Sequence, residues 1–180
     1  SGAAGLSSAD LLALQRAGVG QARVRKLAQI LGVTPTELLL PDLDSAFESY
    51  YATHANSASL RDYGRMLAAL QQGRALDAEG TRYLLDVMGR VQTGRQRIRA
   101  GLPAGATFAH KTGTQYRRLC DSGIVTMPSA AGAAPVRVVI AACVRGATGA
   151  AGERALRDIG AAVTAAGVLR AADPTPTPRR

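Results

Sequence analysis

The sequence predicts an α+β fold of the α/β-sandwich type, with helices first and strands later. Apolar residues recur at helical spacing through most of the first hundred residues. Residues 136–144 are nearly all apolar, as expected for a strand covered on both faces. An amphipathic segment follows and would supply one of those covers. The expected order is therefore a helical part, three antiparallel strands and a closing helix.

The first elements expected are two helices, over residues 8–17 and 20–31. Leucine, valine and isoleucine fall at helical spacing in both, and Gly32 stands where a C-terminal glycine would end the second. Residues 34–37 read Thr-Pro-Thr-Glu, which is a capping box with proline at the first helical position, so a short helix that runs to Leu40 is expected. Residues 45–52 are expected to add another turn or two.

Two longer helices are expected next, over residues 60–72 and from Asp77 to about Val91. Ser59 is a good N-cap for the first of them. Each carries a stripe of apolar residues that should face the core. These stripes are Leu60, Tyr63, Met66, Leu67 and Leu70 in the first helix, and Leu84, Leu85, Met88 and Val91 in the second.

Strands are expected at about residues 106–113, 119–127 and 136–145. The closing helix is expected over 150–167, with Leu156, Ile159 and Val163 in line. We therefore divide the chain into a mostly helical subdomain (1–103), a part with strands and a C-terminal helix (104–170), and a tail (171–180). The tail is rich in proline and cannot form regular structure.

Composition fits one globular unit but does not select a function. The chain has 180 residues, of which 47% are hydrophobic, and a net charge of +9. Such a charge raises nucleic acid as a partner, but the arginines are scattered, and two Phe, five Tyr and no Trp offer little to stack on bases. We therefore expect no nucleic-acid partner. The longest apolar stretch is under 18 residues, so no membrane span is expected.

Cysteine leaves two alternatives open. Cys120 and Cys143 fall on consecutive predicted strands and would face each other if the hairpin is symmetric about residues 131–132. They are either two small buried hydrophobic side chains or a cross-strand disulfide, and a disulfide would fit an oxidising compartment.

One segment has chemistry that can be named, namely Lys111-Thr112-Gly113-Thr114. Lysine occurs only twice in the chain, at Lys26 and Lys111, so a compact ammonium that can point at one carboxylate is kept here among many arginines. Thr112 offers a hydroxyl, and Gly113 leaves room for a ligand backbone. Thr114 offers a main-chain N–H for a developing oxyanion.

This segment resembles the third motif of the penicillin-recognising serine hydrolases, in particular the class A β-lactamases. Around it, the helices after Asn56, the Gly-Arg-Gln-Arg-Ile-Arg-Ala-Gly-Leu-Pro stretch at residues 94–103 and the strand through Asp121-Ser122-Gly123 are similar to the same family. The resemblance is good over residues 57–128 and extends to about 170. It implies a class A β-lactamase-like fold of which the first helix and two strands are missing from this chain.

The resemblance also implies roles for the residues of the motif. Lys111 and Thr114 would be catalytic, Lys111 by tuning the proton relay and Thr114 through its amide. Substrate would be held by Thr112, Gly113, Gln115, Arg117 and Arg118. The expected ligand is a β-lactam or a peptidoglycan stem peptide, the expected location is periplasmic or secreted, and no metal or cofactor is expected. His110 is expected to be a packed strand residue, and His54 a surface-loop residue.

The other motifs of the family are missing. No serine has a lysine three residues later, the only asparagine is Asn56, and no Glu-x-x-Leu-Asn occurs. We therefore expect the C-terminal portion of a longer hydrolase, whose missing N-terminal segment would be its partner and would supply the nucleophile. The alternative is a noncatalytic module that binds β-lactams or stem peptides. A third hypothesis, a helix-turn-helix DNA-binding regulator, rests on the likeness of residues 25–39 to repressor helices.

Overall fold

The structure is a computed structural model that describes residues 5–40, 42–129, 133–147 and 149–170. The predicted tail, 171–180, lies outside the described residues. Contacts group the chain into two compact units, Ser1–Ser57 and Ala58–Arg180. The predicted division at residue 103 stays a prediction, and the two units are described separately below.

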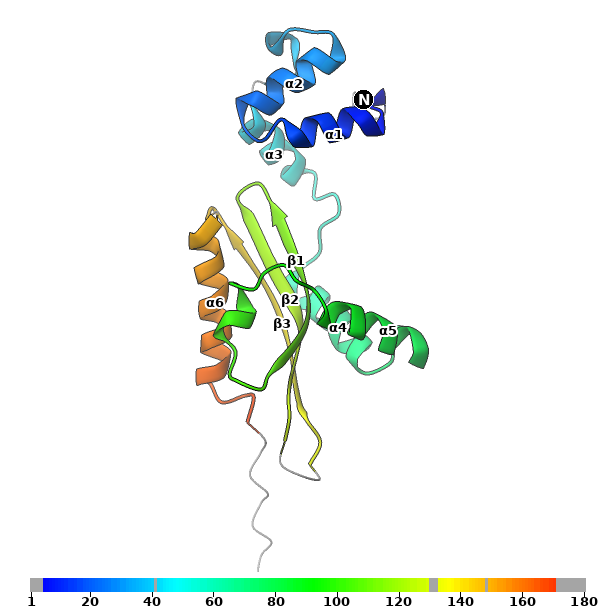
Figure 1. The fold of residues 1–180 in the computed structure, drawn as a ribbon, viewed down its shortest axis with the longest axis vertical. Helices are drawn as coiled ribbons and strands as arrows, with labels where there is room; N and C mark the ends of the chain where they lie inside the picture. Colours follow the sequence, from blue (N-terminus) through cyan, green and yellow to red (C-terminus); the bar gives the residue numbers. More distant parts are fainter. Residues whose placement is uncertain (1–4, 41, 130–132, 148, 171–180) are drawn as a thin grey trace, which may run out of the picture. The chain divides into compact units, whose positions relative to one another are not determined.

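Unit 1 consists of short capped helices (Figure 1). They are α1 (Ser8–Arg16), α2 (Gln21–Leu31), the 3-10 helix η2 (Pro35–Glu37) and α3 (Leu43–Ala52). The predicted caps are confirmed: Gly32 ends α2 in the left-handed conformation, and Thr34 forms a capping box with Glu37. Ser7 and Asp10 form a second capping box on α1. His54 lies exposed after α3, as expected.

Unit 2 is built on a three-stranded antiparallel sheet in the order β1-β2-β3. The strands are β1 (Thr107–Gln115), β2 (Arg118–Met127) and β3 (Val136–Arg145), close to the predicted ranges. Tyr116 and Arg117 make the two-residue connection between β1 and β2, and Arg117 has a positive φ of 49°. The register places Cys120 opposite both Gly113 and Cys143.

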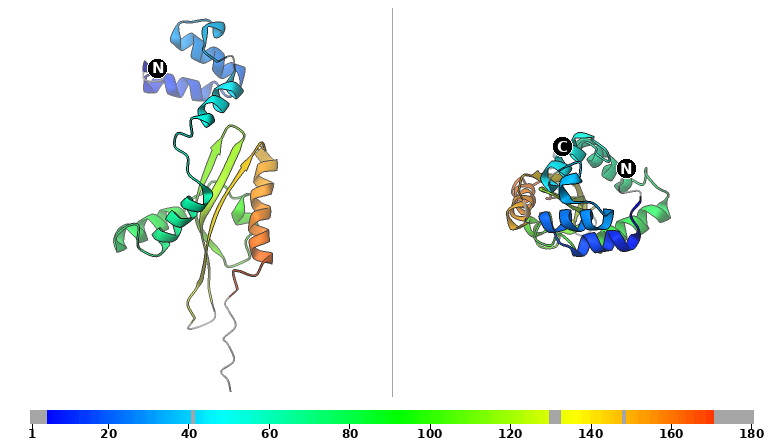
Figure 2. Two further views of the ribbon diagram at one scale, coloured as in Figure 1. Left: turned by 180° about the vertical axis from the view of Figure 1, so that it is seen from behind. Right: turned by 90° about the horizontal axis from the view of Figure 1, so that it is seen from above.

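Helices cover both faces of this sheet (Figure 2). One face packs against α6 (Gly149–Ala165) and the 3-10 helix η3 (Ile98–Gly101), and the other against α4 (Leu60–Gln71) and α5 (Ala78–Gly89). The core on the α6 side includes Ile98, Phe108 and Leu156. The core on the other side is Leu67, Leu70 and Met88. The α+β prediction is therefore confirmed.

The predicted stripes on α4 and α5 were too wide. Leu60 and Met66 are 45% and 49% exposed, and Leu84 is 36% exposed. The buried line on α4 is Leu67 and Leu70, with Tyr63 packed beside it. Spacing alone shows which side of a helix is apolar, but the width of the contact depends on the surface that the helix meets.

Two glycines bring η3 and α6 into close contact. A Cβ atom on Gly101 would collide with the α6 backbone at Arg157 and Ala161, and one on Gly160 would collide with the Ile98 carbonyl. Thr164 adds a hydrogen bond from its hydroxyl to the Gly101 carbonyl at 3.0 Å. The chain segment that ends at Gly101 is therefore held directly against α6.

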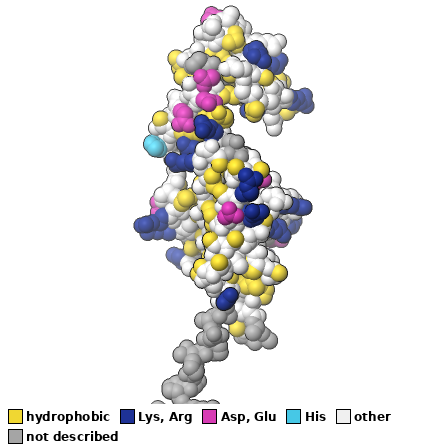
Figure 3. All heavy atoms as spheres, turned by 90° about the vertical axis from the view of Figure 1, so that its left-hand side faces the viewer, with side chains coloured by type: hydrophobic (Ala, Val, Ile, Leu, Met, Phe, Trp, Pro, Cys, Tyr) yellow, Lys and Arg dark blue, Asp and Glu magenta, His cyan; other side chains and the backbone are white. Residues whose placement is uncertain are grey.

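Cys120 and Cys143 are joined by a disulfide between β2 and β3, with Cα atoms 4.0 Å apart. Of the two alternatives that the sequence left open, the structure has the bonded one. The helices in the described ranges all fall short of the length and apolar character needed to cross a membrane. On the face that Figure 3 shows, Lys and Arg side chains are dispersed among other residue types and form no continuous patch.

Candidate functional site

The Lys-Thr-Gly segment lies in the second half of β1, an edge strand of the described sheet. Side chains alternate between the two faces of a strand, so Thr112 and Thr114 share one face and Lys111 and Gly113 the other. Both threonine hydroxyls make side-chain contacts with the segment that precedes η3. Thr112 Oγ1 lies 2.7 Å from Thr93 Oγ1, and Thr114 Oγ1 lies 2.8 Å from a guanidinium nitrogen of Arg97.

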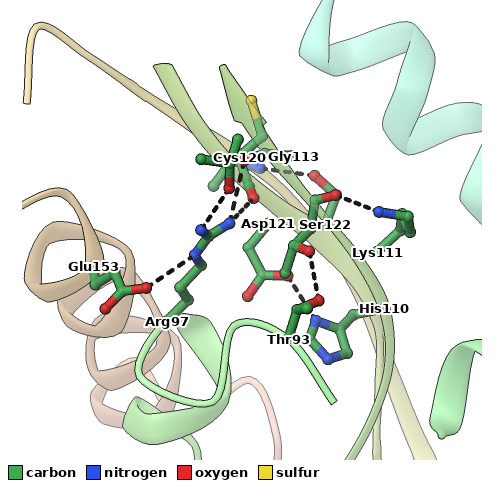
Figure 4. A network of polar contacts seen from close by, with 12 residues as sticks. Thr93, Arg97, His110, Lys111, Gly113, Cys120, Asp121, Ser122 and Glu153 are labelled. Carbon is green, nitrogen blue, oxygen red and sulfur yellow. Dashed lines mark hydrogen bonds and ion pairs between the residues drawn. The ribbon is translucent and has the colours of Figure 1, made fainter. Parts of the chain in front are cut away.

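Arg97 contacts residues of three different elements around the motif (Figure 4). It is only 6% exposed, and its guanidinium donates to the Gly113 carbonyl at 3.2 Å, to the Cys120 carbonyl at 2.9 Å and to the Thr114 hydroxyl. Its Nε lies 3.6 Å from a carboxylate oxygen of Glu153 on α6. One buried cation therefore joins β1, β2 and α6 just behind the motif.

Thr93 and Gly94 bring the preceding segment up to the motif. Gly94 has a positive φ of 71°, and a Cβ atom there would meet Thr112 Cγ2 at 2.5 Å and Arg97 Cδ at 3.3 Å. A side chain at this position would therefore be strained in its backbone and would push the segment away from β1. Glycine allows the Thr93 hydroxyl to reach Thr112.

A buried pair, His110 and Asp121, lies next to the motif. His110 Nδ1 is 2.7 Å from Asp121 Oδ1, and the side chains are 1% and 0% exposed. The imidazole stacks on Phe108 at 4.6 Å, which confirms the expectation of a packed strand residue. His110 Nε2 and Asp121 Oδ2 are buried and find no hydrogen-bond partner among the described residues.

Lys111 is exposed, and its ammonium donates to the Thr112 carbonyl at 2.6 Å. In an antiparallel ladder, alternate residues of an edge strand turn their N–H and C=O groups away from the partner strand. Thr114 has the same parity as Thr112. Because the Lys111 ammonium reaches the Thr112 carbonyl, we infer that the main-chain groups of both threonines face the open edge of β1.

The remaining predicted site residues lie at the turn that follows the motif. Gln115 ends β1 opposite Arg118, and Arg117 is exposed in the connection between the strands. The structure thus brings all seven predicted residues into one hairpin. In the part of the chain described, no group of three or more His, Cys, Asp and Glu side chains could hold a metal ion.

Sequence reasoning missed Thr93, Arg97 and Asp121. Sequence reasoning placed Arg97 only within the stretch at residues 94–103, and Asp121 only within the following strand. Arg97 precedes the apolar Ile98, but the burial of both side chains is known only from the structure. For Asp121 the only clue was its register with Thr112, which needs the paired strands.

A helix-covered antiparallel sheet with Lys-Thr-Gly on its edge strand defines an α+β protein of the class A β-lactamase type. A family model described as a β-lactamase enzyme family matches residues 10–166, so the chain belongs to this family. The match also spans the residues that suggested a helix-turn-helix. A search of curated proteins found no match.

Solved structures of the same kind are similar to part of the chain. A point mutant of PBP-A, in an acyl-enzyme complex with penicillin G, is 33% identical over 62% of this chain and 40% of its own, with a TM-score of 0.54. PBP-A itself is 26% identical over 81% of this chain and 55% of its own, with a TM-score of 0.55. A β-lactamase from Sphaerobacter thermophilus is 29% identical over 60% and 40%, with a TM-score of 0.51. The chain thus spans about half the length of these proteins or less.

Proposed function

We propose that this chain supplies the carboxylate-binding and oxyanion-binding wall of a β-lactamase-like serine hydrolase. The observation that carries the proposal is the arrangement of Lys111, Thr112 and Thr114 on the open edge of β1, with the Arg97 cation buried behind them. The ligand would be a β-lactam or a peptidoglycan stem peptide. This ligand class is supported by the penicillin acyl-enzyme among the similar structures.

In this proposal the carboxylate of the ligand binds to the Lys111 ammonium and the Thr112 hydroxyl. The ammonium would exchange its hydrogen bond to the Thr112 carbonyl for the ligand, and Thr93 would hold the Thr112 hydroxyl in place. A charge-assisted hydrogen bond of this kind is about twice as strong as a neutral one.

The reaction would be acyl transfer to a serine. As the serine oxygen attacks the carbonyl carbon of the ligand, negative charge develops on the carbonyl oxygen. The Thr114 N–H would donate to that oxygen, and loss of one such donor typically costs about 3 kcal/mol of barrier. Arg97 fixes this peptide through Gly113 and the Thr114 hydroxyl. The serine must come from outside this chain, because none of its serines lies in Ser-x-x-Lys.

The finer parts of the proposal concern the rim of the site and the division of the chain. Gln115, Arg117 and Arg118 would form the rim, and residues 1–103 would form a mostly helical subdomain. The Cys120–Cys143 disulfide supports a periplasmic or secreted location, because disulfides persist in oxidising compartments.

A second candidate is a noncatalytic binding module, and the absence of Ser-x-x-Lys from all 180 residues favours it. Such a module would hold the same ligands reversibly. The two candidates therefore share the binding step and differ only in whether a covalent adduct forms once the missing segment is present.

The test is calorimetric titration of the chain with benzylpenicillin, together with intact-mass measurement. We expect reversible binding without an adduct, and we expect Lys111→Ala to weaken it at least tenfold. Lys26→Ala is the matched control, because Lys26 is the only other lysine and hydrogen-bonds to Gln29 in α2. Binding that survives Lys111→Ala would show that the site is wrong. An adduct after a Ser-x-x-Lys segment of the family is added in trans favours the hydrolase, and its absence favours the module.

A further inference from the structure

We propose that the end of the sheet beyond the motif carries a further anion site, in which Arg117, Arg118 and Arg145 bind a phosphate group. We call these three residues the arginine cluster. The site goes beyond the proposed function, because it needs neither acyl transfer nor a ligand carboxylate at Lys111. It borders the proposed rim, with which it shares Arg117 and Arg118.

The strand register brings the arginine cluster together. Arg118 on β2 and Arg145 on β3 are direct partners, and the Arg117 carbonyl accepts a hydrogen bond from the Gly146 N–H at 2.9 Å. Residues directly opposite each other in an antiparallel pair have neighbouring side chains on one face of the sheet. Two guanidinium groups therefore leave the same face side by side, with Arg117 in the adjoining turn.

The type of strand pairing brings the two facing side chains closer. Cys120 and Cys143, two residues along the same ladder, have Cα atoms 4.0 Å apart, which is the short spacing of a non-hydrogen-bonded pair. Pair types alternate along an antiparallel ladder, so Arg118 and Arg145 also form a non-hydrogen-bonded pair. Like charges directly opposite each other destabilise a sheet, and an anion bound between the two guanidinium groups would remove this cost.

The acidic side chains of the surrounding elements are engaged elsewhere. The three strands and α6 contain only three acidic residues, and each of them pairs with a basic residue outside the cluster. The pairs are Asp121–His110, Glu153–Arg97 and Asp158–Arg157. Among the described residues, Arg117 and Arg145 form no ion pair.

Within unit 2, the helices leave this end of the face uncovered. α4 and α5 pack on the same face around Ala109 and Val139. Arg145 lies six residues beyond Val139 on β3, which is about 20 Å along a strand. Arg117 and Arg145 are exposed, and Arg118 is half-buried. An anion in solution therefore has access to the cluster from unit 2.

The chemistry of the cluster favours phosphate over carboxylate. A guanidinium is a planar fork that donates two parallel hydrogen bonds to two oxygens. A carboxylate has two oxygens and one charge, so it satisfies one fork. A phosphate group has at least one more acceptor oxygen and up to two charges, so it can accept hydrogen bonds from both facing guanidinium groups.

This site is separate from the carboxylate site of the proposed function. Arg118 pairs with Gln115, which follows Lys111 by four residues on β1. Four residues of a strand span about 13 Å. A single phosphate held between Arg118 and Arg145 would therefore not occupy the position of a carboxylate beside Lys111.

The test is an NMR titration of the full chain with inorganic phosphate at constant ionic strength, followed through the arginine Nε–Hε signals. We expect the signals of the cluster to shift together. Arg145→Gln should weaken binding at least about tenfold, because it removes a charged donor. Arg137→Gln is the matched control and should leave the affinity unchanged, since Arg137 lies on the same strand and face but opposite Thr126.

Thermal unfolding gives a second measurement that three solvated arginines would not move. In phosphate-free buffer, Arg145→Gln should unfold at a higher temperature than the wild type, because it removes a like-charge pair. Phosphate should then raise the unfolding temperature of the wild type and of Arg137→Gln more than that of Arg145→Gln.

Vesicles identify the source of the phosphate group. Co-sedimentation with phosphatidylglycerol vesicles that Arg145→Gln weakens and Arg137→Gln does not would assign an anionic lipid headgroup. Binding of inorganic phosphate at the cluster without binding to vesicles would assign a soluble phosphate ester. Either result supports the site.

The proposal is overturned if neither inorganic phosphate nor the vesicles bind at the cluster, or if Arg145→Gln and Arg137→Gln bind them equally. It is also overturned if Lys111→Ala abolishes the shifts at the cluster, since the phosphate would then be bound beside the Lys-Thr-Gly motif. None of these measurements uses benzylpenicillin, so failure of this inference leaves the proposed function standing, and failure of the proposed function leaves this inference standing.

Discussion

Replacing the His110–Asp121 pair with apolar residues tests how the sheet beneath the motif is stabilised. His110 precedes Lys111 in β1, and Asp121 lies opposite Thr112 in β2. Both side chains are fully buried and share one hydrogen bond, while one polar atom of each finds no partner among the described residues. A pair with half its polar atoms satisfied contributes little net stability, but breaking it from one side is costly.

We expect His110→Leu to destabilise unit 2 by about 3 to 5 kcal/mol, because it leaves a buried carboxylate without its partner. Asp121→Val should cost about 1 to 3 kcal/mol, because it leaves a buried imidazole without its hydrogen-bond partner. The double variant should lie within about 1 kcal/mol of the wild type, since it removes both polar groups and keeps a similar volume. The coupling energy between the two positions is then about 3 kcal/mol or more in favour of the pair.

The assay is urea unfolding followed by NMR signals of β1 and β2, so that unit 2 is observed by itself. The coupling energy comes from the four free energies of unfolding in the cycle. The reasoning is refuted if His110→Leu lowers the free energy of unfolding by less than about 1 kcal/mol. It is also refuted if the double variant loses as much stability as the two single variants together.

Two further predictions concern glycine packing and helix caps. Gly160→Ala should destabilise unit 2 by more than about 2 kcal/mol in urea unfolding, because the added Cβ would collide with the Ile98 carbonyl. Gly64→Ala in α4 is the control: its Cβ would meet nothing within 4 Å, so the higher helix propensity of alanine should stabilise unit 2 by about 0.5 to 1 kcal/mol. Equal effects of the two would contradict this. Hydrogen bonds from the Ser7 side chain and backbone hold the pKa of Asp10 below its ordinary value. The Asp10 carboxylate therefore stabilises the start of α1 fully at pH values above that ordinary pKa, and this stabilisation is lost as the pH falls through the lower pKa of the folded state. An NMR titration in which the α1 amides do not respond to acid would show that the cap contributes nothing.

Local patterns were sufficient for the elements and for the motif. Caps at Ser59 and Gly32 marked helix ends, and the apolar run of β3 marked a buried strand. These features depend on neighbours within a few residues, so a single sequence carries them. The same holds for Lys111-Thr112-Gly113-Thr114, whose chemistry is visible in four consecutive letters.

The surroundings of the motif could not be read in this way. Arg97 is separated from Thr114 by 17 residues, and the Asp121 partner of His110 follows it by 11 residues on another strand. Glu153 meets Arg97 only because α6 packs on the sheet. Each of these contacts depends on strand register or helix packing, for which a polar residue in a sequence gives no local sign.

By itself, then, the sequence determined the order of helices and strands, the caps, and the Lys-Thr-Gly-Thr segment for which we propose carboxylate binding. Tertiary structure alone decided that the two cysteines are bonded, that a buried arginine joins three elements behind the motif, and that a glutamate on the last helix lies against that arginine. The difference between what the sequence shows and what only the structure shows follows from distance along the chain. Hydrogen-bonded turns and apolar periodicity involve near neighbours, whereas the ion pair and the disulfide described above join residues that only folding brings together.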